Sequence, residues 1–148
     1  MTDKAFATHK YLSQYKDLKC KTAELRDKVE LFESAVTALC KALTTNESKH
    51  APFENKTELK HVILVDLKNE IGVDIAKHLE ICGRIEWLVT KADEDGLLRD
   101  YYINGESLQA MAEQKEVGET TIRRTRNKLL DTTYGIAMHN EVNLTTTY

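Results

Sequence analysis

The chain has 148 residues, of which 41% are hydrophobic and 30% charged, and this composition excludes an intrinsically disordered protein. A net charge of -3 gives no overall attraction to nucleic acid, so any such function must reside in a local basic surface. Six Gly and one Pro are few for this length, and this scarcity predicts an all-α protein with long helices.

The first predicted helix extends from Lys4 to Leu43, a stretch without Gly or Pro. It would be roughly 60 Å long at about 1.5 Å per residue. Its apolar residues alternate in steps of four and three, which is a heptad seam. Since one helix cannot bury this seam alone, it needs a second copy of the chain or another helix of the same chain. The seam consists of Tyr11, Tyr15, Leu18, Thr22, Leu25, Val29, Phe32, Val36, Leu39 and Leu43.

A polar connector at residues 44–56 holds the only proline, Pro52, and should be a loop. Thr57 is the predicted N-cap of a second long helix that lasts to about Lys91. The broad apolar face of this helix suits contact with more than one neighbour. An antiparallel hairpin within the chain and a dimeric coiled coil are both open, and a dimer of hairpins would satisfy both long helices.

Residues 92–96, with the sequence ADEDG, should end the second helix and cap the next one. A short amphipathic helix is predicted after them, and it should stop at Asn104 and Gly105. We expect it to support the helices that follow as the first helix of a three-helix module. Its apolar residues are Leu97, Leu98, Tyr101 and Tyr102.

Two short helices joined by a tight break are predicted between Ser107 and Leu130. Ser107 is a good N-cap for the first, residues 115–118 form the break, and the second begins near Glu119. Two short helices with a basic outer face on the second are typical of a helix-turn-helix. The predicted inward face carries Ile122, Thr125 and Leu129, and the predicted outward face carries Arg123, Arg124, Arg126, Asn127 and Lys128.

A basic helix of this kind could bind double-stranded DNA, because one helix fits the major groove and Arg matches the two acceptors of guanine. The alternative is a solvated helix face in an ordinary bundle. In the DNA-binding interpretation, we expect Glu119, Thr120, Arg123 and Arg124 to face base edges. The residues expected on phosphates are Lys115, Arg126, Asn127 and Lys128.

The runs YINGESLQAMA and TIRRTRNKLL resemble the promoter-reading part of bacterial sigma factors, sigma region 4. Ala112, Ile122 and the run at residues 126–128 match that pattern, whereas Lys115 and Glu116 stand where an apolar residue and Gly are usual. With the long helices before it, the layout is similar to ArpU/RinA-type late transcription regulators of phages. The resemblance implies a late-gene activator that acts at a promoter with host RNA polymerase.

Together these patterns predict a two-helix coiled-coil arm at 1–91, a helix-turn-helix module at 92–134 and a flexible tail at 135–148, with Gly135 ending the last helix. The arm would make the protein a homodimer. The alternative function is a helical protein-interaction factor that sequesters or modulates a host protein without binding DNA. The acidic balance and the unusual residues of the turn favour this alternative.

The remaining patterns suggest no enzyme and no cofactor. The five His are scattered, and the acidic residues near Asp93 do not fit a calcium-binding loop, so no metal is expected. Three widely spaced Cys are typical of free thiols in a reducing cytoplasm. The sequence shows no apolar leader and no apolar run of membrane-spanning length, and we therefore expect a cytoplasmic protein, which the resemblance places in a bacterial host cell.

Overall fold

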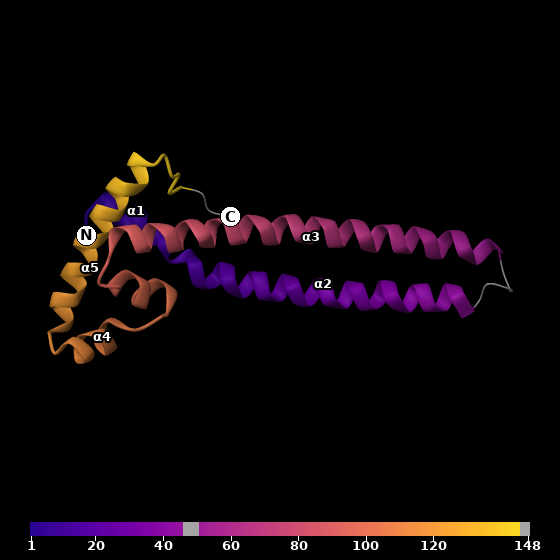
Figure 1. Cartoon of the computed structure of the whole chain (residues 1–148), viewed down its shortest axis with the longest axis horizontal. Helices are drawn as coiled ribbons and strands as arrows, with labels where there is room; N and C mark the ends of the chain where they lie inside the picture. Colours follow the sequence, from indigo (N-terminus) through magenta and orange to yellow (C-terminus); the bar gives the residue numbers. More distant parts are fainter. Residues whose placement is uncertain (46–50, 146–148) are drawn as a thin grey trace. The chain divides into compact units, whose positions relative to one another are not determined.

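The computed structural model describes residues 1–45 and 51–145, and these residues are all-α, as the sequence predicts (Figure 1). They contain no strand. The helices are α1 (Asp3–Leu12), α2 (Gln14–Thr45), α3 (Ala51–Ala92), the π-helix η1 (Arg99–Ile103), α4 (Leu108–Lys115) and α5 (Glu119–His139).

The helices divide into two compact units, which we call the terminal unit (Met1–Lys19 with Leu79–Tyr148) and the hairpin unit (Cys20–His78). The sequence placed the boundary at 91 instead. The units divide elsewhere because both ends of the long arm share a core with the C-terminal helices. Tyr11 and Leu12 of α1 and Leu88 of α3 are buried in one cluster with Leu98 and Leu130.

In the hairpin unit, α2 and α3 run side by side in opposite directions (Figure 1). An ion pair joins them, with Lys68 Nζ lying 2.7 Å from Glu33 Oε1. The expected seam residues Leu25, Val29 and Val36 are half-buried, whereas most of their neighbours on α2 are exposed. The pairing seen here is therefore the hairpin within the chain. The expected seam residues Leu39 and Leu43 lie outside the described side chains.

The helix boundaries differ from the predicted ones in two places. The helix expected across 4–43 is interrupted at Ser13, whose hydroxyl donates to the carbonyl of His9 at 2.7 Å and so competes for a backbone acceptor. The loop expected at 44–56 is shorter, since α2 continues to Thr45 and α3 begins at Ala51; residues 46–50 lie outside the described part. Thr57 is therefore no N-cap, and Pro52 occupies the first turn of α3, where no backbone donor is needed.

The break after α3 forms as predicted, around the buried carboxylate of Asp93. Its Oδ2 accepts from the backbone N–H of Leu98 at 2.7 Å, and its Oδ1 accepts from that of Asp95 at 3.1 Å. The short helix that follows is a π-helix, in which the N–H of Asn104 donates to the carbonyl of Arg99. It ends at Ile103, directly before the predicted stop at Asn104 and Gly105, and the φ of Gly105, 77°, is one that favours Gly.

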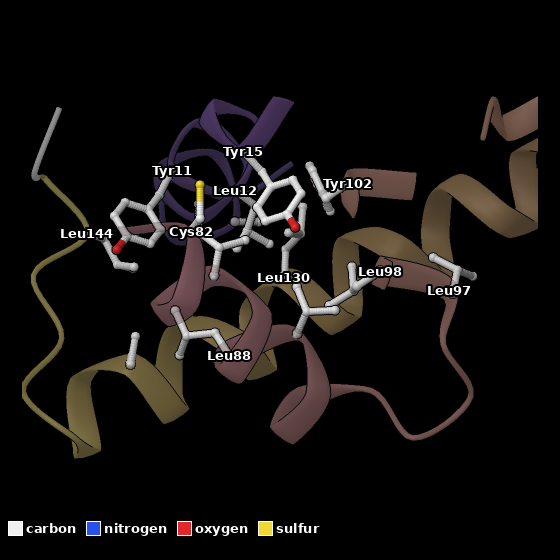
Figure 2. Close-up of a cluster of buried hydrophobic side chains, with 14 of the residues drawn as sticks. Tyr11, Leu12, Tyr15, Cys82, Leu88, Leu97, Leu98, Tyr102, Leu130 and Leu144 are labelled. Carbon is white, nitrogen blue, oxygen red and sulfur yellow. The ribbon is translucent and has the colours of Figure 1, made fainter. Parts of the chain in front are cut away.

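The core of the terminal unit consists of buried side chains from both ends of the chain (Figure 2).

The C-terminal segment differs from the expected flexible tail at 135–148. Gly135 does not end α5, which continues to His139 and has Asn140 as its C-cap; Glu141 follows with a φ of 57°. Burial of Ala137 and Leu144 favours this extension and offsets the intrinsic helix cost of Gly, about 1 kcal/mol. Residues 146–148 of the expected tail lie outside the described part.

Candidate nucleic-acid interface

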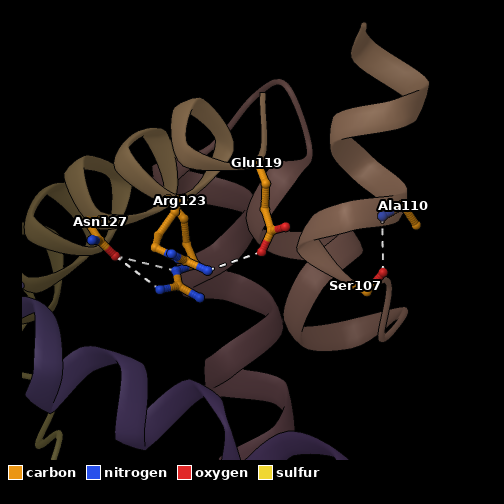
Figure 3. A network of polar contacts seen from close by, with 6 residues as sticks. Ser107, Ala110, Glu119, Arg123 and Asn127 are labelled. Carbon is orange, nitrogen blue, oxygen red and sulfur yellow. Dashed lines mark hydrogen bonds and ion pairs between the residues drawn. The ribbon is translucent and has the colours of Figure 1, made fainter. Parts of the chain in front are cut away.

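Helix α4 begins where the sequence predicts. The hydroxyl oxygen of Ser107 accepts a hydrogen bond from the backbone N–H of Ala110 at 3.0 Å, which is the N-cap geometry (Figure 3). Met111 and Ala112 are buried against the core of the terminal unit. The helix is thus fixed at its start and along its inner face.

The turn after α4 is compact and follows a known helix-ending motif. The N–H of Val117 donates to the carbonyl of Ala112 at 3.1 Å, and the N–H of Glu116 donates to that of Glu113 at 3.3 Å. This pair of bonds defines a Schellman motif. Glu116 adopts the left-handed conformation, with a φ of 55°, whereas Gly118 has a φ of -71° and serves as the N-cap of α5.

The buried side of α5 is not the one predicted from the sequence. Ile122 is buried as expected, but Thr125 is exposed and Leu129 is only partly buried. The reason is the length of α5, which contacts both α1 and α4, so its inner stripe follows the fit along the whole helix. The stripe consists of Ile122, Arg126, Leu130, Thr133 and Ala137.

The outward side of α5 carries most of the expected DNA-facing residues. Arg123 pairs with Glu119 one turn earlier, with 3.1 Å between Nη2 and Oε1 and exposed fractions of 53% and 49% (Figure 3). Such an exposed pair contributes about 0.3–0.5 kcal/mol, so a duplex could displace it. Glu119, Thr120, Arg123, Arg124 and Lys128 are all exposed, as is Lys115 at the end of α4, and Asn127 is half-buried.

Arg126 is the exception, and the expectation that it points outward is wrong. Its side chain is only 7% exposed, because it occupies the stripe position between Ile122 and Leu130. The guanidinium carbon lies 5.1 Å from the centre of the Tyr101 ring, a cation–π distance. Both Nε and Nη2 donate to Oδ1 of Asn127, at 3.4 and 3.2 Å.

A polar cluster that the sequence did not reveal lies next to Arg126. Nδ1 of His9 lies 2.6 Å from the hydroxyl oxygen of Tyr102, and the Tyr101 and Tyr102 rings meet edge to face at 4.7 Å. Burial, and then the charge of Arg126, lowers the pKa of His9. Burial raises the pKa of Tyr102. Each shift favours the neutral form of its group, which suits a site beside a buried cation.

The described residues show no sign of a metal site or a membrane span. In the described part of the chain, no three His, Cys, Asp or Glu side chains lie together as metal ligands would. No described helix is both long and apolar enough to span a bilayer. Cys20 is exposed and Cys82 is buried, each as a free thiol.

No family model, curated protein or solved structure matches the chain. The interpretation of the exposed side of α5 therefore rests on its residues and geometry.

Proposed function

We propose that the chain is a sequence-specific DNA-binding transcription regulator. The observation that carries the proposal is the exposed basic side of α5, which lies on a helix whose other side is seated in the core of the terminal unit. Arg124 and Lys128 are four residues apart and both exposed, so they lie one above the other on the same face. Helix α4 and the Schellman turn hold the start of α5, as the supporting helix of a helix-turn-helix does.

In this proposal α5 lies in the major groove. Arg123 and Arg124 donate to guanine O6 and N7, and Glu119 and Thr120 face neighbouring base edges. Phosphates are contacted on either side by Lys115 and by the pair Asn127 and Lys128. Arg126 is not among the proposed phosphate contacts, because the residue is buried and cannot reach a duplex.

The partners beyond DNA are also proposals. The resemblance to phage late regulators favours host RNA polymerase, in the bacterial cytoplasm, as the machinery on which the protein acts. A homodimer through the N-terminal helices is supported by apolar side chains left exposed on the hairpin unit, among them Leu31, which is 68% exposed, Val62 and Val73. Sedimentation of the purified protein measures this state, and a twofold protein implies a twofold operator.

The same exposed side chains favour a second candidate function, a helical protein-interaction factor that modulates a host protein. In that case the hairpin unit would supply the working surface, and the pairing of Arg123 with Glu119 would serve only the helix itself. The two candidates differ in one simple observation. A regulator binds a duplex more tightly as salt is lowered, whereas an interaction factor shows no binding even at low salt.

Selection of duplexes from a random pool, followed by titration of the enriched sequence, tests the proposed function. Replacing Arg123 with Ala should cost roughly 1–3 kcal/mol at one base position and relax the preference there. Arg84→Ala is the matched control, since Arg84 is also exposed and also pairs with a Glu four residues earlier, at 2.6 Å. Equal binding by both variants would remove Arg123 from the interface, and failure to enrich any sequence would refute the proposal.

A further inference from the structure

The contact between Arg126 and Asn127 fixes the orientation of an amide at the edge of the proposed interface. A guanidinium group has donors and no acceptor, so the Asn127 atom that faces it must be the oxygen. Nε and Nη2 of Arg126 both donate to that oxygen. The two N–H donors of the Asn127 amide are therefore left for another partner.

Resting on the proposed function, we propose that Arg126 is a positioning residue, which turns the Asn127 amide so that its NH2 group donates to a phosphate of the bound duplex. Three observations on Arg126 carry the proposal: its burial in the α5 stripe, its place over the Tyr101 ring and its hydrogen bonds to Asn127. The burial and the ring contact fix the position of the guanidinium. The hydrogen bonds then fix the orientation of the Asn127 amide.

The identity of residue 127 fits this role. An Asp there would complete an ion pair with the buried Arg126, but it would place a carboxylate at a phosphate surface and repel it. Asn accepts from Arg126 through its oxygen and still offers donors outward. None of the ion pairs found within the described residues involves Arg126, so Asn127 is the side-chain acceptor of this cation.

The test is a double-mutant cycle on Arg126→Met and Asn127→Ala, read as affinity for the enriched duplex at one salt concentration. Loss of one hydrogen bond to a phosphate weakens binding roughly threefold to tenfold. We expect Arg126→Met to weaken binding in the wild-type background and to have no further effect beside Asn127→Ala. Arg126→Lys keeps a charged donor and should retain most of the affinity. Penalties that multiply in the double variant would overturn the positioning role.

A second arm reports on the contact without DNA and remains informative if Arg126→Met folds poorly. Asn127→Asp should melt at a higher temperature than Asn127→Ala, because its carboxylate pairs with Arg126, yet it should bind the duplex more weakly. Equal melting temperatures would contradict the contact. If the wild-type protein binds no duplex at low salt, the proposed DNA function fails together with the positioning role, whereas multiplying penalties in a wild type that binds defeat the positioning role alone.

Discussion

Replacing Glu116 with Gly should stabilise the protein, although Gly substitutions in helical proteins usually do the opposite. Glu116 is the C′ residue of α4 and holds the left-handed conformation, with a φ of 55°. In that conformation the Cβ atom of an L-residue lies too close to a following carbonyl oxygen. Gly lacks this atom, so Glu116→Gly relieves the clash and leaves the Schellman hydrogen bonds in place.

The size of the effect follows from two opposing contributions to the free energy of unfolding. Relief of the left-handed conformation contributes roughly 1–2 kcal/mol. The greater freedom of Gly in the unfolded chain costs about 0.5–1 kcal/mol. The net gain is therefore about 0.5–1 kcal/mol, which corresponds to a melting temperature higher by about 2 °C for a chain of this size.

Glu113→Gly is the matched control for this measurement by thermal or urea unfolding. Glu113 lies three residues earlier, inside α4, and is also exposed, so the same change of charge is made in a helical conformation. There Gly should cost about 1 kcal/mol. We expect Glu116→Gly to raise the free energy of unfolding and Glu113→Gly to lower it. If Glu116→Gly destabilises as much as Glu113→Gly, the turn between α4 and α5 does not have the geometry described here.

Two further substitutions test the packing around the module. Asp93→Asn should cost about 1–3 kcal/mol in urea unfolding, because one amide oxygen cannot accept from both the Leu98 and Asp95 N–H groups in the way the buried carboxylate does. His9→Asn should flatten the loss of stability on acidification. Burial and the charge of Arg126 lower the pKa of His9 in the folded protein, so the unfolded chain binds a proton more readily. Neutral His9 therefore contributes fully to the free energy of unfolding above its ordinary pKa of 6.5. This contribution is lost as the pH falls through the pKa of the folded state.

Each of these two substitutions has its own control. Asp95→Asn changes the same chemical group at an exposed position and should shift the free energy of unfolding by less than about 0.5 kcal/mol. For the pH series, the comparison is the melting temperature of His9→Asn and of the wild type from pH 8 to pH 5. Parallel curves would show that burial and the charge of Arg126 do not lower the pKa of His9. If Asp93→Asn has the same free energy of unfolding as the wild type, the break after α3 does not depend on the carboxylate.

The features predictable from sequence are those set by short-range chemistry. Ser107 caps α4, Asp93 breaks α3, and Gly105 stops η1, since each acts on backbone groups within a few residues of itself. The seam of the first long helix was predictable for a related reason. Its period is a property of the helix, whichever partner covers it.

The features that were missed depend on residues far apart in the chain. Arg126 is buried on the inner stripe of α5 and contacts the ring of Tyr101, 25 positions earlier. A basic residue among other basic residues gives no sequence signal for either. The left-handed conformation of Glu116 was missed for a different, local reason, because a Glu gives no sequence signal for a positive φ. The length of α5 was underestimated because its last turns are stabilised by packing in the core and not by helix propensity.

The central claim is that the exposed basic side of α5 binds a DNA duplex, and the salt dependence of the affinity tests it most directly. The plot of log Kd against log salt concentration should be measured for the wild type and for Lys128→Ala on the same duplex. Each phosphate contact contributes a slope of about 0.9 in magnitude. We expect a steep slope for the wild type and one smaller by about 0.9 in magnitude for Lys128→Ala. A wild-type protein that does not bind at the lowest salt concentration, or identical slopes for both proteins, would contradict it.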